Sequence, residues 1–220
     1  PDTVLDGFTL TGGTGTVLNG WGERGGGGMS ILNSSPTVNN CTFDGNTATA
    51  GGGMFNDDFS SPTVTAGKFS GNTANYGGGM YNRYSDPMVT DCDFSENRAT
   101  RGGGMYNFPS SPTVTNCTFD GNTAGCGGGM WNWSGSPTVT RCIFSVNSAD
   151  AGGGMHNSFS TPTVTDCQFS GNIGFAGGGM DNYYSSPTVT HCSFSGNAVH
   201  SRGGGMSNTL ANPKVANCTF

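Results

Sequence analysis

The sequence predicts an all-β fold, a parallel β-helix (a β-solenoid) in which about nine coils of about 25 residues stack into one rod. Three observations predict it. A methionine that follows a run of glycines recurs at residues 29, 54, 80, 105, 130, 155, 180 and 206. Two further residue types recur at the same interval. They are a proline, at 36, 62, 87, 112, 137, 162, 187 and 213, and a phenylalanine, at 43, 69, 94, 119, 144, 169, 194 and 220. Between turn residues, apolar side chains alternate over short runs, which is the strand period.

The repeat predicts three short strands per coil, with the consensus words GGMxN, TVT and CxF. Glycine, asparagine and Ser-Pro pairs between them supply the turns. We expect residues 1–220 to form a single β-helix domain, with an irregular N-terminal coil over 1–28, regular repeats over 29–220 and no evident caps. The second repeat gains a residue at Asp57-Asp58, which we expect to be a solvated loop.

Alternation places the methionine, valine, cysteine and phenylalanine of each coil in inward-facing files. Glycines beside them leave room for the bulky methionine and phenylalanine. Asparagine forms two further files, which we expect to be structural because an amide can accept from one coil and donate to the next. These files are 46, 72, 97, 122, 147, 172 and 197, and 56, 82, 107, 132, 157, 182 and 208.

Seven cysteines share one inward file, and Cys126 lies apart in a predicted turn. The file is 41, 92, 117, 142, 167, 192 and 218. Neighbouring coils hold their Cβ atoms about 4.8 Å apart, whereas a disulfide prefers about 3.8 Å. We therefore expect mostly buried thiols that act as small hydrophobic side chains.

The repeated words GGGM and FSGN resemble the GGA-[ILV] and FxxN repeats of chlamydial polymorphic outer-membrane proteins. The run SSPTVTNCTFDGNTA (110–124) and the opening TVLDGFTLTGG (3–13) are similar to repeats of large secreted bacterial proteins with a right-handed parallel β-helix. The resemblance implies right-handed coiling, export, and an extracellular or bacterial cell-surface location.

Composition argues against several classes of function. Only 10% of residues are charged, the net charge is −6, and eight scattered Lys and Arg give no basic face for nucleic acid. The sequence contains no run of 18 apolar residues, so we expect no membrane insertion. The chain has two Glu, Glu23 and Glu96, and His156, His191 and His200 fall at different coil positions. We expect no catalytic residues, no metal, no cofactor and no enzymatic activity.

Aromatic residues follow the inward methionines at positions that alternation turns outward, and we call them the aromatic ridge. They are Phe55, Tyr81, Tyr84, Tyr106, Phe108, Trp131, Trp133, Tyr183 and Tyr184. Two interpretations stay open: the rings cover neighbouring coils, or they form a contact strip for a glycan or a surface protein.

Threonines flank the inward valine of the TVT word and predict two outward files, with rungs about 4.8 Å apart. They are Thr63, Thr65, Thr113, Thr115, Thr138, Thr140, Thr163, Thr165, Thr188 and Thr190. This T-x-T lattice resembles the ice-binding face of solenoid antifreeze proteins. The plain alternative is that threonine suits an exposed strand.

The sequence therefore favours a non-enzymatic extracellular module with a structural or adhesive role. Both ends stop at the same phase of the coil, which predicts either an excerpt of a longer surface rod or a filament subunit that self-associates head to tail through its coil ends. The alternatives are an ice-binding protein that uses the threonine array, and a β-helix that binds or cleaves polysaccharide.

Overall fold

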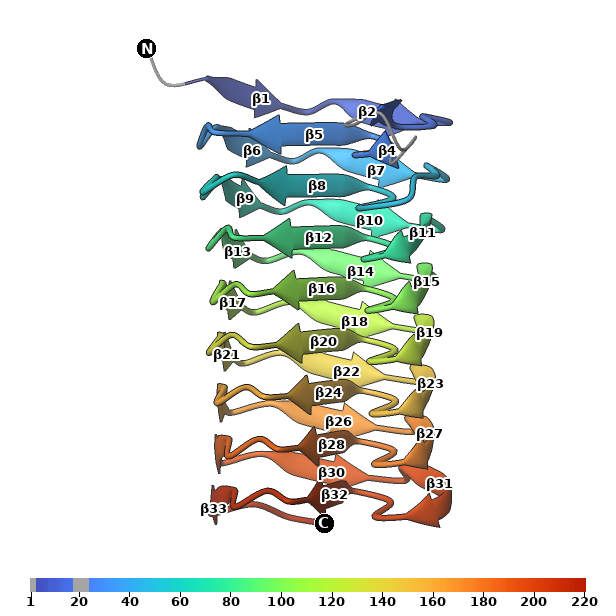
Figure 1. Ribbon diagram of the computed structural model, residues 1–220, viewed down its shortest axis with the longest axis vertical. Coiled ribbons are helices and arrows are strands. Elements are labelled where there is room, and N and C mark those ends of the chain that lie inside the picture. The colour runs from blue at the N-terminus through green and yellow to red at the C-terminus, as the bar shows by residue number, and fades with distance from the viewer. Residues whose placement is uncertain (1–2, 18–23) are drawn as a thin grey trace.

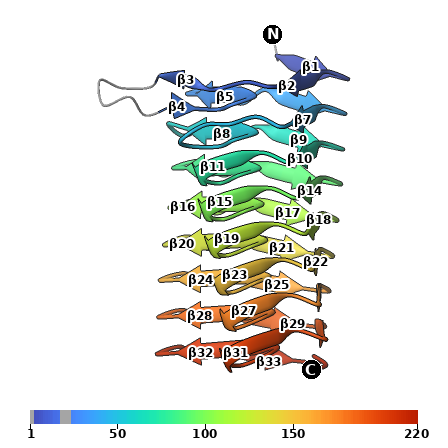
Figure 2. The ribbon, with the colours of Figure 1, turned by 90° about the vertical axis from the view of Figure 1, so that its right-hand side faces the viewer.

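The computed structural model describes residues 3–17 and 24–220, and the regular structure within them is β-strand throughout. The strands wind into a parallel β-helix whose coils stack from the N-terminal end to the C-terminal end (Figure 1). Each regular coil crosses four sheets, which we call A, B, C and D in chain order. Figure 2 turns the sheet C side of the rod toward the viewer.

Sheets A and B carry the TVT and CxF words. Sheet A comprises β1 (Val4–Asp6), β6 (Thr37–Asn39), β9 (Thr63–Thr65), β13 (Met88–Thr90), β17 (Thr113–Thr115), β21 (Thr138–Thr140), β25 (Thr163–Thr165), β29 (Thr188–Thr190) and β33 (Lys214–Ala216). Sheet B comprises β2 (Thr9–Thr11), β7 (Thr42–Asp44), β10 (Lys68–Ser70), β14 (Asp93–Ser95), β18 (Thr118–Asp120), β22 (Ile143–Ser145), β26 (Gln168–Ser170) and β30 (Ser193–Ser195).

Sheet D carries the methionine word, and from β12 (Met80–Arg83) onward a strand of sheet C precedes each of its strands. Sheet D comprises β5 (Met29–Leu32), β8 (Met54–Asp57), β12 (Met80–Arg83), β16 (Met105–Phe108), β20 (Met130–Trp133), β24 (Met155–Ser158), β28 (Met180–Tyr183) and β32 (Met206–Thr209). Sheet C comprises β11 (Thr73–Tyr76), β15 (Arg98–Arg101), β19 (Thr123–Cys126), β23 (Ser148–Ala151), β27 (Ile173–Ala176) and β31 (Ala198–Arg202). A short antiparallel pair, β3 (Thr16–Val17) and β4 (Arg24–Gly25), replaces it in the first coil.

Sheet C corrects the expectation of three strands per coil, because the segment after a sheet B strand is also a strand in six coils, from β11 to β31. Its inward side chains are small, as at Ala74 and Ala149. Cys126, expected in a turn, is the last residue of β19. Small inward residues let this strand lie close to the core without a bulky file of its own.

Coils stack in register, so like residues meet. Met105 pairs with Met130, and Val114 pairs with Val139. The phenylalanine file shows the spacing: the rings of Phe94 and Phe119 stack with centroids 4.8 Å apart and planes 5° apart. These files form one hydrophobic core along the rod. At about 25 cal/mol per Å² of buried apolar surface, this core is the main favourable term in folding.

The glycine triplets sit where backbones approach closely. Gly102 makes the corner between sheets C and D with φ +63°, a conformation that favours glycine. A Cβ on Gly103 would lie 2.4 Å from the carbonyl oxygen of Gly128 in the next coil. Substitution there would push two coils apart, so the triplet fixes the stacking rather than loosening it.

Both asparagine files are buried hydrogen-bond ladders. The backbone N–H and the side-chain amide of Asn97 both donate to Oδ1 of Asn122, each at 3.0 Å, and the amide also donates to the Phe69 carbonyl at 2.8 Å. In the second file, the Asn107 amide donates to Oδ1 of Asn132 at 2.8 Å. These bonds satisfy buried polar groups that would otherwise cost free energy.

Candidate functional site: an aromatic recess on sheet D

The outer face of sheet D carries three parallel files of side chains, which together we call the aromatic strip. Its floor is the residue after each methionine: Phe55, Tyr81, Tyr106 and Trp131. One border is the last residue of each sheet D strand, namely Arg83, Phe108 and Trp133. The other border is the last residue of each sheet C strand, namely Tyr76, Arg101 and Cys126.

For Phe55, Tyr81, Tyr106 and Trp131, the burial agrees with the first interpretation of the ridge, in which the rings cover neighbouring coils. They point away from the main core, as alternation requires, but each is at most 5% exposed. They form a second hydrophobic cluster, with the border residues packed against it. The cause is sheet C, which the sequence did not predict. The last residues of its strands, among them Tyr76, Arg101 and Cys126, pack against the floor on the side away from the sheet D border.

Within the floor, the rings stack from coil to coil. Centroids lie 5.2 Å apart for Phe55 and Tyr81, 5.0 Å for Tyr81 and Tyr106, and 4.9 Å for Tyr106 and Trp131. The border ring of Trp133 stacks on Trp131 at 5.7 Å. Because every ring touches at least one other, the surface that they offer is rigid before any ligand arrives.

A shallow hollow of about 290 Å³ opens over the middle of the strip. Its lining is Tyr76, Tyr81, Arg83, Arg101, Tyr106, Phe108 and Trp133. Phe108 and Trp133 are only partly buried, so their rings are in contact with solvent. Apolar walls with a few polar groups are the usual composition of a binding site for a small ligand.

The two arginines of the recess are held differently. Arg83 makes a two-pronged ion pair with Asp57, with Nε to Oδ1 at 2.9 Å and Nη2 to Oδ2 at 2.5 Å. Asp57 is therefore buried and paired, not solvated as expected from the sequence. The Arg101 guanidinium carbon lies over three rings, 5.2 Å from Trp131, 5.5 Å from Tyr76 and 5.7 Å from Trp133.

Tyr106 keeps its proton in this setting. Burial raises the pKa of its hydroxyl well above the ordinary value, and the neighbouring Arg101 opposes that shift without cancelling it. Tyr106 is thus uncharged at pH 7, and of the two arginines at the borders, Arg83 is neutralised by its ion pair with Asp57.

Beyond Trp131, the floor file turns polar. His156 and Asp181 take the next two rungs, both buried, with Nδ1 to Oδ2 at 2.9 Å. The two atoms are close but are not aligned as a hydrogen bond. The aromatic strip therefore ends at this pair.

The remaining ridge residues lie at or beside the turn that follows sheet D, where they are partly exposed. Tyr84 contacts Phe108 edge-on at 6.3 Å and so adjoins the recess. Tyr183 and Tyr184 contact Phe159 and form a separate cluster, two coils beyond Trp133. The nine ridge residues are thus a buried floor, a border and two exposed groups, rather than one surface.

The threonines lie in register on sheet A. Thr113, Thr138, Thr163 and Thr188 pair in succession, and Thr115, Thr140, Thr165 and Thr190 do the same. Thr63 and Thr65 belong to the same two files, but Met88 separates Thr63 from Thr113 and is 54% exposed. The lattice is therefore regular over four coils.

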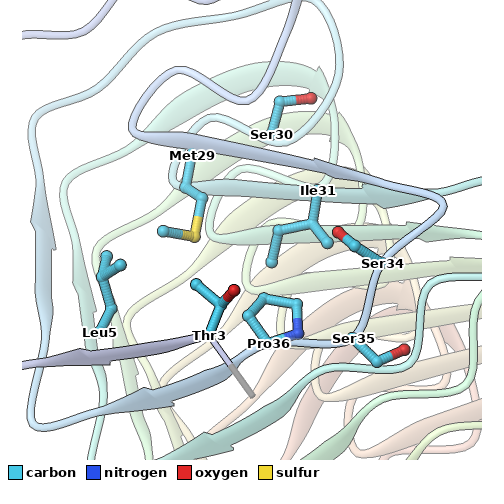
Figure 3. A pocket seen from close by; sticks show the side chains of 8 residues that line it. All are labelled: Thr3, Leu5, Met29, Ser30, Ile31, Ser34, Ser35 and Pro36. Carbon is cyan, nitrogen blue, oxygen red and sulfur yellow. The ribbon is translucent and has the colours of Figure 1, made fainter. Parts of the chain in front are cut away.

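A larger hollow, of about 400 Å³, lies at the N-terminal end between β1 and β5 (Figure 3). Its walls are the core residues Leu5, Met29 and Ile31 together with hydroxyl groups and a proline. None of the described residues that line it is charged or titratable. We interpret it as the open end of the hydrophobic core and not as a site for chemistry.

The thiols of the inward file are free and buried, except that Cys218 is half-buried. From Cys117 onward, each Sγ of the file accepts the backbone N–H of the cysteine one coil earlier, as from Cys117 to Cys142 at 3.4 Å, and Cys92 Sγ accepts the N–H of Gly67 in the same way. Hydrogen bonding between neighbouring thiols, together with burial, raises the pKa of Cys117 and Cys192. Among the described residues, no three His, Cys, Asp or Glu side chains are grouped as metal ligands.

Sequence reasoning missed the border residues Tyr76, Arg83, Arg101 and Cys126. Three of them occupy the position directly before the glycine triplet, which varies from coil to coil and so carries no repeat signal. The one available signal was their place next to a corner glycine, because a sharp corner brings the residues on either side of it together.

Comparison with known proteins agrees with this geometry. A family model described as a right-handed β-helix region matches residues 7–144, more than half of the chain. No curated protein matches the sequence. The part of the chain that the structure describes contains no helix able to cross a bilayer. The stacked parallel sheets and the family match lead to one conclusion: the chain belongs to the right-handed β-helix family.

Proposed function

We propose that this chain is a non-enzymatic β-helix module of the cell exterior whose aromatic strip binds carbohydrate. The observation that carries the proposal is the recess, in which the partly exposed Phe108 and Trp133 stand over a buried, stacked floor. Aromatic faces present a large apolar area at little cost in conformational entropy, which suits the C–H faces of sugars. The rod itself supplies a rigid, extended support for such a surface.

The exterior location rests on the resemblance of the GGGM and FSGN words to chlamydial surface-protein repeats and to secreted β-helix repeats. The structural or adhesive role follows from that location and from the strip. The non-enzymatic character is supported by the placing of two described acids: Asp57 is tied to Arg83, and Asp181 faces His156. Arg83 occupies both oxygens of Asp57, and both Asp57 and Asp181 are buried, so neither carboxylate is presented to a substrate from solvent.

Binding of the chain to an array of neutral and acidic glycans tests this proposal. We expect Trp133→Ala and Phe108→Ala to weaken the binding of any captured glycan by about tenfold or more. Phe175→Ala is the matched control, because Phe175 is an exposed ring on sheet C, away from the strip, and its removal should change nothing. Unchanged binding by both strip variants would refute the carbohydrate role.

Ice binding is the second candidate, favoured by the two threonine files that run in register over four coils of sheet A. Each coil contributes two threonines to this lattice, so two methyls and two hydroxyls repeat from coil to coil along the rod. The two candidates use different sheets, A for the threonines and D for the aromatic strip, so a substitution can be made on one without changing the residues of the other.

A further inference from the structure

Arg101 lies at the centre of the recess. It is the last residue of β15, directly before the corner at Gly102, and its side chain is half-buried. Its guanidinium group is surrounded by the rings of Tyr76, Trp131 and Trp133 at 5.2–5.7 Å. These contacts place the guanidinium charge of Arg101 beside the partly exposed ring of Trp133.

Among the described residues, Arg101 makes no ion pair with a carboxylate. In residues 3–17 and 24–220 the two side-chain ion pairs are Arg83 with Asp57 and His156 with Asp181. Asp150 and Asp181 both act electrostatically on Cys126, one coil further on, but neither pairs with Arg101. Tyr106, whose pKa is raised chiefly by burial, is neutral and does not compensate the charge.

Aromatic rings attract a cation but carry no net charge. A cation–π contact contributes about 0.5–1 kcal/mol when exposed and about 2 kcal/mol when desolvated. A guanidinium also has five N–H donors in a fixed fork, which match the two oxygens of a carboxylate or of a sulfate. The rings hold the Arg101 fork in place in the recess, ready for an oxyanion.

We infer that the recess takes an acidic glycan, a sugar chain bearing carboxylate or sulfate groups, with the oxyanion on Arg101 and the sugar faces on Phe108 and Trp133. This inference rests on the proposed function and adds the chemical class of the ligand. The recess holds about 290 Å³, which suits one or two sugar rings and not a folded partner. Arg83 contributes less to the choice of ligand because Asp57 already neutralises it.

Calorimetric titration with three probes tests the inference: a polyuronate oligosaccharide, a sulfated galactan oligosaccharide and a neutral cello-oligosaccharide. We expect at least one acidic probe to bind about tenfold more tightly than the neutral probe, and we expect added salt to reduce that preference. The Arg101→Gln variant should lose the preference and retain the binding of neutral sugar. Arg98→Gln, an exposed arginine on the same strand, is the matched control and should keep the preference.

The outcomes separate the inference from the proposed function. Equal binding of neutral and acidic probes, or an unchanged preference in Arg101→Gln, overturns the inference and leaves a carbohydrate-binding strip. Binding of none of the probes overturns both. If Arg101→Gln does not fold, as judged by circular dichroism, the salt dependence of the parent decides, because a preference that salt leaves unchanged cannot come from this charge.

Discussion

At the scale of single residues, the side of a strand on which a residue lies does not decide its burial. Trp131 and Thr138 both point away from the main core, yet Trp131 is 5% exposed and Thr138 is in contact with solvent. The difference is that Arg101 and Trp133 cover Trp131 from its two sides. The floor of the recess is therefore a stability element, and its border is the contact surface.

Trp131→Ala should lower the free energy of unfolding by about 3 kcal/mol, within the range for burying or removing a large aromatic side chain. Tyr184→Ala should change it by less than about 1 kcal/mol, because that ring is 47% exposed. Urea unfolding followed by tryptophan fluorescence and circular dichroism measures both. Equal effects of the two substitutions would contradict the buried floor.

The cysteines should divide into two reactivity classes. In the native protein we expect a thiol reagent at pH 8 to label at most two of the eight, Cys126 and Cys218, because the other six are buried. Labelling at Cys126 should be slow, since burial raises its pKa and lowers its thiolate fraction. Mass spectrometry identifies the sites, and full denaturation should release all eight. Rapid native labelling of Cys142 would show that the inward file is open.

At the scale of strands and sheets, no element is stable alone. The strands are two to five residues long, and each inner strand is held by the coils before and after it. Parallel pairs this short gain their stability from the files that cross them. The asparagine ladders are the clearest case, since each amide connects consecutive coils.

Asn122→Ala should be strongly destabilising, by about 2–5 kcal/mol, because it leaves two donors of Asn97 and the Phe94 carbonyl without partners. Asn75→Ala is the control: Asn75 is exposed on sheet C, and its loss should cost less than about 0.5 kcal/mol. The shift in unfolding midpoint measures the difference. A mild effect at Asn122 would mean that water replaces the lost amide.

Sheet A allows a direct test of the ice-binding candidate. If the threonine lattice binds ice, the parent chain should show thermal hysteresis and shape ice crystals, and Thr138→Tyr should reduce the effect several-fold by placing a bulky ring in the middle of the lattice. Trp133→Ala should leave thermal hysteresis unchanged, because Trp133 lies on sheet D. A parent chain without thermal hysteresis would remove this candidate.

The repeat explains why the coils, the core files and the ladders were predictable. Met105, Val114 and Phe119 each recur at a fixed step, and a fixed step in a parallel stack places like residues together. Sheet C was not predictable in the same way. Its residues, such as Thr73–Tyr76 and Arg98–Arg101, differ from coil to coil, and its inward alanines give no apolar signal.

The recess was only half predictable for the same reason. Alternation placed Phe108 and Trp133 outside the core, but it describes one sheet at a time. The contacts of Arg101 with Trp131 and Trp133 join sheet C to sheet D across a corner and between two neighbouring coils. Contacts of this kind depend on the angle at the glycine corner, which the repeat does not encode.

At the scale of the whole rod, the outermost described strands pair on one side only. These are β1, β2 and β5 toward the N-terminus and β32 and β33 toward the C-terminus, whereas β30 also bridges to Thr219 (Figure 1). Apolar side chains accompany these edges, including Val4 at 57% and Phe220 at 65% exposure. Unpaired strand edges with apolar neighbours favour the addition of another strand.

The 220-residue chain should therefore self-associate head to tail in solution. The Phe220 ring stacks on Phe194 at 4.8 Å and leaves its other face free, so in an end-to-end contact it would extend the phenylalanine file onto Leu10 of the next molecule. Sedimentation at increasing concentration should show a growing series of species rather than a single dimer, because a contact between unlike ends does not close. Phe220→Lys should shift this series toward the monomer by placing a charge in the contact, whereas Phe175→Lys, on the side of the rod, should not. A chain that stays monomeric at high concentration would show that its exposed edges are protected against pairing.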